Sequence, residues 1–209
     1  MDVHWITTYA TEPLCVAIWT SSNTHMKKVS HGTKAHAIML LGMVIWRYLD
    51  TSKAAAENGH LECLKYAHEN GCPWDVDTCC FAAMNGHLEC LKYAHDNSCP
   101  WDEGTCCCAA AKGNLECLKY AHENGCPWGD ELTSVNAARN GHLECLKYAH
   151  ENGCPWDEDT CMAAAEKGHV EVLQYAVQNG CPWDRDEVLR EGTSEVRAWV
   201  QNMLSQRNA

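Results

Sequence analysis

A repeat of about 27 residues is the feature that most constrains how this chain can fold. The seventeen residues GHLECLKYAHENGCPWD at positions 59–75 return unchanged at 141–157. The glycine that opens the phrase recurs at Gly59, Gly86, Gly113, Gly141 and Gly168, and a threonine keeps the same step at Thr51, Thr78, Thr105, Thr133 and Thr160. A fixed period of this length indicates an array of small stacked units rather than one globular core.

Composition and charge narrow the classes of function. Of the 209 residues, 46% are hydrophobic, which is too many for a disordered chain. The formal net charge of -12 lies in residues 51–209, which hold twelve Lys/Arg against twenty-five Asp/Glu, while residues 1–50 are nearly neutral. Since acidic residues repel phosphate, we expect no nucleic-acid partner.

The N-terminal region predicts the compartment and the state of the cysteines. The longest apolar run, 37–46, is about half of the ~20 residues that a membrane-spanning helix needs, so we expect no membrane association. The first residues lack the basic start and apolar stretch of a secretory signal. We therefore expect an intracellular, cytoplasmic protein whose sixteen cysteines are free thiols rather than disulfides.

Each unit is predicted to be a pair of helices. The first contains two invariant alanines, and we expect the preceding threonine to be its N-cap and the following glycine to end it in left-handed backbone. In the second, Leu61, Leu64 and Ala67 share one face, and Gly71 and Pro73 end the helix. Such a pair cannot bury its apolar face alone, so the sequence predicts an all-α solenoid.

The segments AAAENGHLECLKYAHENG (54–71) and AAAEKGHVEVLQYAVQNG (163–180) resemble the ankyrin repeat in their paired alanines, Gly-His turn, Leu-Glu or Val-Glu helix start and closing glycine. The resemblance covers residues 51 to about 186. These shortened units, which carry Cys-Pro-Trp-Asp, are similar to an ankyrin variant common in large DNA viruses and some protists. The resemblance implies a solenoid of stacked helix-turn-helix repeats with reduced or absent β-hairpins.

This pattern divides the chain into regions. Residues 1–34 have no assignment, and residues 35–50 are predicted to form an N-terminal capping helix. Five ankyrin-like repeats follow at 51–77, 78–104, 105–132, 133–159 and 160–186. Residues 187–209 are predicted to contain a partial repeat and a C-terminal capping helix, whose apolar stripe is Val196, Trp199, Val200, Met203 and Leu204.

The cysteines and histidines of the repeat do not predict a metal site. Cys63 and His68 point about 140° apart on a helix, while His60 and Cys72 lie on the order of 15 Å apart along its axis. Equivalent residues of neighbouring units are about 8 to 10 Å apart, too far for a disulfide. We therefore interpret the cysteines as small buried hydrophobic residues. The one crowd of non-equivalent thiols, where metal or redox chemistry would begin, is Cys79, Cys80, Cys106, Cys107 and Cys108.

Three other columns of residues are assigned structural roles. In the Gly-His turn we expect the side chain to bond the backbone of an adjacent loop, a role that Asn114 can share with His60, His87, His142 and His169. At the end of the second helix we expect a histidine to interact with the last carbonyls, in the column His68, His95, His122 and His150. The tryptophans are expected to hold units together, in the column Trp74, Trp101, Trp128, Trp156 and Trp183.

Function is expected where the units differ. No catalytic set or phosphate loop is present, so we predict a non-enzymatic protein without a cofactor. By the ankyrin resemblance the first helices line a concave face, which implies a monomeric scaffold that binds another protein. The candidate contact residues are Lys53, Glu57, Phe81, Met84, Asn136, Arg139, Met162 and Glu166. The alternative is a metal-binding or redox-responsive protein that uses its cysteines and histidines.

Overall fold

The computed structural model describes residues 51–207, which form six successive pairs of α-helices and contain no strand. The pairs are α4 (Thr51–Glu57) with α5 (Leu61–Glu69), α6 (Val76–Met84) with α7 (Leu88–Asp96), α8 (Glu103–Lys112) with α9 (Leu115–Glu123), α10 (Leu132–Arg139) with α11 (Leu143–Glu151), α12 (Glu158–Lys167) with α13 (Val170–Gln178), and α14 (Arg185–Glu191) with α15 (Ser194–Arg207). The predicted all-α solenoid is confirmed. The capping helix expected at 35–50 and the segment 1–34 lie outside the described residues.

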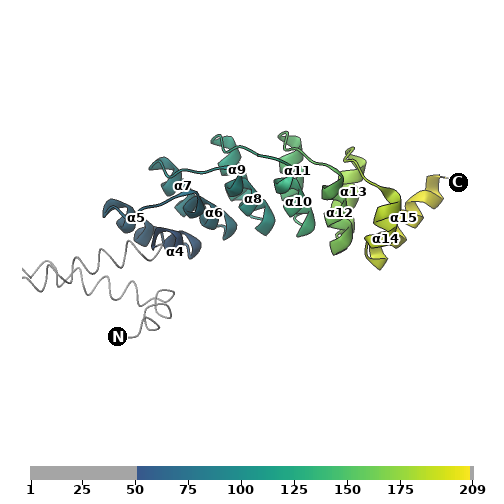
Figure 1. Ribbon diagram of the computed structural model, residues 1–209, viewed down its shortest axis with the longest axis horizontal. Coiled ribbons are helices and arrows are strands. Elements are labelled where there is room, and N and C mark those ends of the chain that lie inside the picture. The colour runs from purple at the N-terminus through teal and green to yellow at the C-terminus, as the bar shows by residue number, and fades with distance from the viewer. Residues whose placement is uncertain (1–50, 208–209) are drawn as a thin grey trace, which may run out of the picture.

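The pairs stack side by side into a curved array, with the first helices on the inner side of the curve (Figure 1). Neighbouring first helices pack against each other more extensively than neighbouring second helices do. The paired alanines explain this difference, because Ala82, Ala83, Ala109 and Ala110 are fully buried and let the helices approach closely. The second helices carry larger side chains at their junctions, so the array bends toward the first helices.

The core runs along the array as columns of small and medium side chains. The leucine column is fully buried in all five repeats: Leu64, Leu91, Leu118, Leu146 and Leu173. Beside it lie Cys90, Cys117 and Cys145, which are at most 2% exposed, and burial raises the pKa of each thiol to about 11. The interpretation of these column cysteines as small buried hydrophobic residues is confirmed.

The first helices begin earlier than predicted. Asp75 is the N-cap of α6: its carboxylate accepts a hydrogen bond from the Asp77 N–H at 3.2 Å, and Thr78 accepts one from the Asp75 N–H at 3.4 Å. Asp102 and Asp157 cap α8 and α12 through their carboxylates, which accept from the Gly104 N–H at 3.0 Å and the Asp159 N–H at 3.0 Å. The expectation that threonine is the N-cap was therefore wrong for α6, α8, α10 and α12, whose N-caps are acidic residues. A carboxylate at the positive end of a helix is favourable, and the threonine two residues into the helix is buried instead.

The last pair closes the described part of the array. Val196 and Val200 of α15 are fully buried, and Trp199 and Leu204 pack against the same core. The apolar stripe expected for this helix thus lies against the preceding units, where it covers their exposed edge.

Candidate protein-interaction face

Three positions of the first helices vary from unit to unit and build the inner face. Position 1 holds Lys53, Cys80, Cys107, Val135 and Met162. Position 2 holds Ala54, Phe81, Cys108, Asn136 and Ala163. Position 3 holds Glu57, Met84, Ala111, Arg139 and Glu166. Only Val135 and Ala163 are buried among these fifteen side chains, so the rest are at least partly open to solvent.

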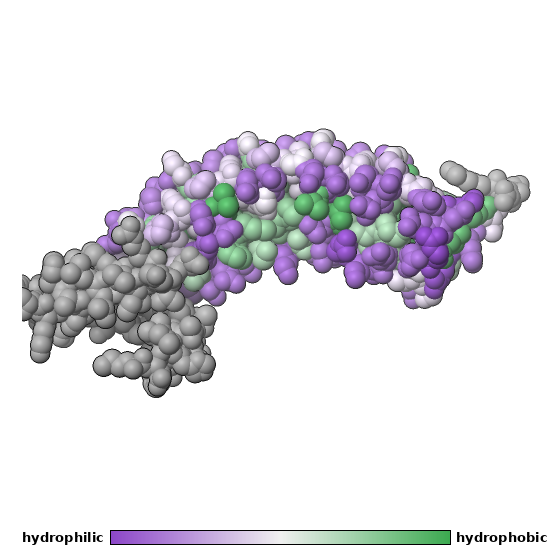
Figure 2. All heavy atoms as spheres, in the orientation of Figure 1, coloured by the Kyte–Doolittle hydropathy of each residue, from purple (hydrophilic) through white to green (hydrophobic). Residues whose placement is uncertain are grey.

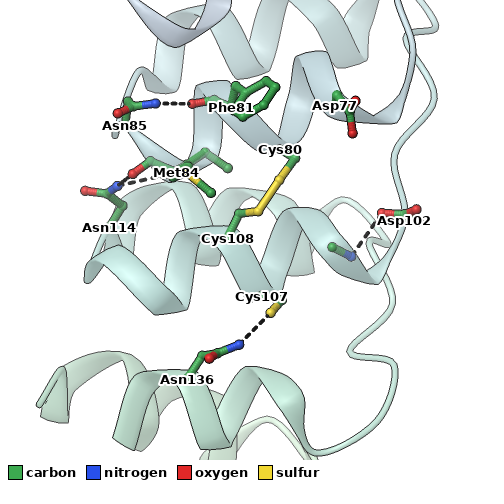
Figure 3. The surroundings of a disulfide bond; sticks show 12 residues. Asp77, Cys80, Phe81, Met84, Asn85, Asp102, Cys107, Cys108, Asn114 and Asn136 are labelled. Atoms are coloured by element: carbon green, nitrogen blue, oxygen red, sulfur yellow. Dashed lines mark hydrogen bonds between the residues drawn. A yellow bond between two sulfur atoms is a disulfide. The ribbon is translucent and has the colours of Figure 1, made fainter. Parts of the chain in front are cut away.

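Side chains at positions 1 and 2 link neighbouring first helices. Cys80 of α6 and Cys108 of α8 form a disulfide, with their Cα atoms 5.8 Å apart (Figure 3). One unit further on, the Asn136 side-chain amide donates a hydrogen bond to the Cys107 sulfur at 3.0 Å. In both places position 1 of one unit faces position 2 of the next.

The expectation that all cysteines are free thiols was wrong for this pair. The spacing of about 8 to 10 Å applies to equivalent residues of neighbouring units, whereas Cys80 and Cys108 differ by one place within the unit. Closely packed first helices bring these non-equivalent positions within disulfide range. Twelve other cysteines, those between Cys72 and Cys181, carry free thiols. The disulfide lies within the cluster of non-equivalent thiols at positions 79–80 and 106–108, where the sequence indicates that redox chemistry would begin.

The charged candidates differ in how far they are engaged within the array. The ammonium of Lys53 lies 3.1 Å from a carboxylate oxygen of Asp75 and 2.7 Å from one of Asp77, which joins α4 to the start of α6. Glu57, Arg139 and Glu166, all at position 3, have exposed side chains. Position 3 therefore offers the charged groups of this face that are most open to a partner.

Apolar candidates occupy the middle of the face. Phe81 and Met84 of α6 lie near the disulfide and are partly exposed, as is Met162 of α12. Figure 2 shows apolar surface along the middle of the array, bordered by hydrophilic atoms. At the start of the first helices, the acidic side chains of Glu103, Glu158 and Asp159 are exposed. The array therefore combines an apolar strip with exposed acidic groups at these helix starts.

The Gly-His turns tie the opposite ends of the first helices together. The His87 ring nitrogen Nε2 lies 3.0 Å from the Glu57 carbonyl of the preceding unit. Asn114 replaces histidine in its unit and donates to the carbonyls of Ala83 at 3.0 Å and Met84 at 2.7 Å. The expected bonding to the backbone of an adjacent unit is confirmed for His87, Asn114 and His169, with acceptors at the end of the preceding first helix instead of in a loop. The exchange of histidine for asparagine preserves it.

Stacked aromatic rings join the units on the other side. The Trp74 ring stacks on His68 of its own unit with centroids 3.8 Å apart, and meets Tyr93 of the next unit edge-on at 6.3 Å. Equivalent clusters are His95–Trp101–Tyr120, His122–Trp128–Tyr148 and His150–Trp156–Tyr175. The role expected for tryptophan is confirmed for Trp74, Trp101, Trp128 and Trp156. The histidine contact is with this ring, which the sequence pattern did not predict, and the tyrosine column was missed although it follows the same period.

Leu132 is the one large hydrophobic residue between 51 and 207 that is clearly exposed, at 51%. It lies at the start of α10, in the turn that carries the single-residue insertion, and its N–H donates to the Asp130 carboxylate at 3.1 Å. The signal that could have identified it is an apolar residue where other units carry Asp77, Gly104 and Asp159.

Metal and membrane sites find no support in this part of the chain. Within residues 51–207 no three His, Cys, Asp or Glu side chains come together in a way that could hold a metal ion. No helix of the same residues has the length and apolar character needed to cross a membrane.

Comparisons with known proteins agree with this geometry. The family model for ankyrin repeats (many copies) matches residues 52–95. The human ASB11 ankyrin repeat domain, a crystal structure, superposes with a TM-score of 0.60 at 19% sequence identity, over 72% of this chain and 82% of that chain. No curated protein matches the sequence significantly. The described residues thus adopt the fold of an ankyrin-repeat solenoid.

Proposed function

We propose that this array is a non-enzymatic scaffold that binds a partner protein through the inner face of its first helices. The observation that carries the proposal is the contrast in variation. The second helix reads LECLKYAHE in α5, α9 and α11, whereas the first helices differ at all three inner-face positions. Residues needed for stacking recur in every unit, so differences between units mark the surface that is free to acquire specificity.

The face indicates the chemistry of the partner. Phe81, Met84 and Met162 offer partly exposed apolar contacts, and position 3 adds the charges of Glu57, Arg139 and Glu166. Lys53 and Asn136 also bond within the array, so in the proposal they shape the face as well as contact the partner. With exposed acidic groups at the starts of the first helices, the face suits a protein that presents apolar side chains flanked by basic ones.

Two features of the chain support the cellular compartment and the type of ankyrin repeat that we propose. The many free thiols of the repeats favour an intracellular compartment, where cysteines stay reduced. The 27-residue step and the Cys-Pro-Trp turn support its classification among the shortened ankyrin units of large DNA viruses and some protists. We propose a monomer that uses no cofactor and binds no nucleic acid.

A comparative capture experiment tests the face. The intact chain, a Phe81→Ala/Met84→Ala/Arg139→Ala variant and a matched Glu89→Ala/Lys119→Ala/Glu144→Ala variant of the second helices are immobilised, and bound proteins are quantified by mass spectrometry. Circular dichroism verifies that all three are folded. We expect a protein that the intact chain and the second-helix variant retain equally and the first-helix variant loses at least tenfold. Equal recovery by all three would contradict the choice of face.

A further inference from the structure

We propose that Cys80 and Cys108 form a reversible dithiol–disulfide site on the inner face, closed by small disulfides such as glutathione disulfide and opened by small thiols. The inference deepens the proposed function, because the site lies among the residues assigned to partner binding. Its chemistry requires no partner, so it can be tested even if that proposal fails.

Among the contacts between position 1 of one repeat and position 2 of the next, two thiols meet at one of the four junctions between the five repeats. Position 1 faces position 2 of the next unit, and between α6 and α8 these places hold Cys80 and Cys108. Between α8 and α10 the same places hold Cys107 and Asn136, joined by a hydrogen bond. The corresponding residues at the remaining two junctions are Lys53 with Phe81 and Val135 with Ala163.

The sulfur atoms of the Cys80–Cys108 pair are also more accessible to dissolved reagents than the thiols of the core. Thiol–disulfide exchange requires a thiolate to reach a sulfur atom. Cys80 and Cys108 are partly exposed on the inner face, whereas Cys90, Cys117 and Cys145 are at most 2% exposed and burial raises their pKa. A dissolved reagent therefore meets the first pair in the folded array, while the core thiols are shielded and remain protonated at neutral pH.

The chemistry is a two-electron exchange. The thiolate of Cys80 or Cys108 attacks glutathione disulfide, forms a mixed disulfide and releases one glutathione. The second cysteine, after it loses its proton, attacks the bound sulfur and releases another glutathione. Two protein thiols and one glutathione disulfide thus give one protein disulfide and two glutathione molecules, and two external thiols reverse the reaction.

Closure of the site has a mechanical effect on the proposed face. The bond spans 28 residues of sequence and joins α6 to α8 beside Phe81 and Met84 (Figure 3). While it is closed, the second and third units cannot separate along the inner face. When it opens, the two units are held by packing and by the Asn114 hydrogen bonds to α6, and two thiols are added to the surface that a partner would contact.

Redox titration of the full chain tests the site. The folded protein is equilibrated in graded mixtures of reduced and oxidised glutathione, quenched with acid, alkylated and mapped by peptide mass spectrometry. We expect reversible interconversion of a Cys80–Cys108 disulfide with the dithiol, while Cys90, Cys117 and Cys145 stay reduced throughout. If Cys80 and Cys108 remain thiols in the most oxidising mixture, or pair with other cysteines, the proposal is overturned.

Thermal unfolding provides a second readout. Closing a loop of this length is expected to raise the unfolding midpoint by about 5–10 °C relative to the reduced protein. The rise should vanish in Cys80→Ser and in Cys108→Ser. It should persist in Cys107→Ser, the matched control, whose cysteine lies on the same helix but contacts Asn136 instead. A rise that survives in Cys80→Ser would assign the effect to other cysteines and contradict the proposal.

Discussion

The second helices and the first helices of this array obey different constraints. α7 and α9 differ only in their last residue and bury the equivalent cysteine, leucine and alanine. α8 and α10 keep the alanine pair, yet one presents Cys107 and Cys108 at the inner face where the other has Val135 and Asn136. Stacking therefore fixes most of the second helix but only one side of the first.

The reason lies in what each helix contacts. A second helix packs on its own first helix and on the second helices of the units on both sides. It also carries the histidine and tyrosine that stack around tryptophan in the turns. The first helix meets its neighbours through small alanines and leaves its inner side open. Four experiments test this contrast between the first and second helices.

The largest loss of stability is expected for Leu118→Ala, in the centre of α9. This side chain is fully buried, and its truncation leaves a cavity that costs about 3–4 kcal/mol of unfolding free energy. Arg139→Ala, on the exposed inner side of α10, should cost less than about 0.5 kcal/mol. Urea unfolding followed by circular dichroism measures both, and similar costs would remove the distinction between the two helices.

Next in size is Trp101→Ala, with an expected cost of about 2–3 kcal/mol, because this ring joins His95 of its unit to Tyr120 of the next. Trp183 is the internal comparison. It follows the same Cys-Pro turn, but Val177 stands where the histidine would be, and it stacks on no ring of the described residues. We expect about 1 kcal/mol for Trp183→Ala by the same denaturation assay. A larger loss at Trp183 would show that the stacks do not hold units together.

Alkaline pH should weaken the core of the second helices. Burial raises the pKa of Cys90, Cys117 and Cys145 to about 11 from an ordinary value of 9.0. Between pH 9 and pH 11 these thiols therefore ionise in the unfolded chain but stay protonated in the folded one, which favours unfolding. The stabilisation is complete below pH 9 and is lost progressively as the pH rises through 11. Unfolding measured from pH 8 to 11 under reducing conditions tests this, and the triple alanine variant should show a flatter profile. An unchanged profile would exclude these thiols as the cause.

The smallest difference between two variants is expected for two glycines that both have left-handed backbone. Gly113 has a φ of +75°, and an added Cβ would lie 2.6 Å from the His142 ring of the next unit. Gly125 has a φ of +89° but no atom within 4 Å of such a Cβ. We expect about 2 kcal/mol for Gly113→Ala and about 1 kcal/mol for Gly125→Ala, since both strain the backbone but only the first disturbs a junction. Equal losses of unfolding free energy would show that the contact between Gly113 and the His142 ring does not stabilise the junction.

The sequence was sufficient for features that a single unit contains. Helix pairs, left-handed glycines and the buried leucine column follow from residue order within 27 positions, because the same pattern occurs five times. The helix starts were misplaced because Asp75 and Thr78 can both serve as caps, and only the geometry of the turn selects between them. The sequence alone does not show which of two neighbouring capping residues the backbone will use.

Features between units were harder to predict. The disulfide depends on a one-place offset between α6 and α8, which arises from how closely the alanines pack and not from the spacing of Cys80 and Cys108. The Tyr93 contact to Trp74 likewise joins residues of two units, whose separation the repeat length does not state. The candidate face was assigned from variation and resemblance, so its contact residues remain predictions, and exposed Leu132 was not among them.

Equivalent junctions also bear on how such a chain can change length in evolution. Each unit presents the same edge of alanines, leucine and aromatic rings to its neighbour, so a duplicated segment of 27 residues would find matching surfaces on both sides. Genes for such arrays can grow or shrink by whole units while the product still folds. An insertion between α6 and α8 is the exception, because it would part Cys80 from Cys108. That pair gives two otherwise interchangeable units a fixed order in the chain.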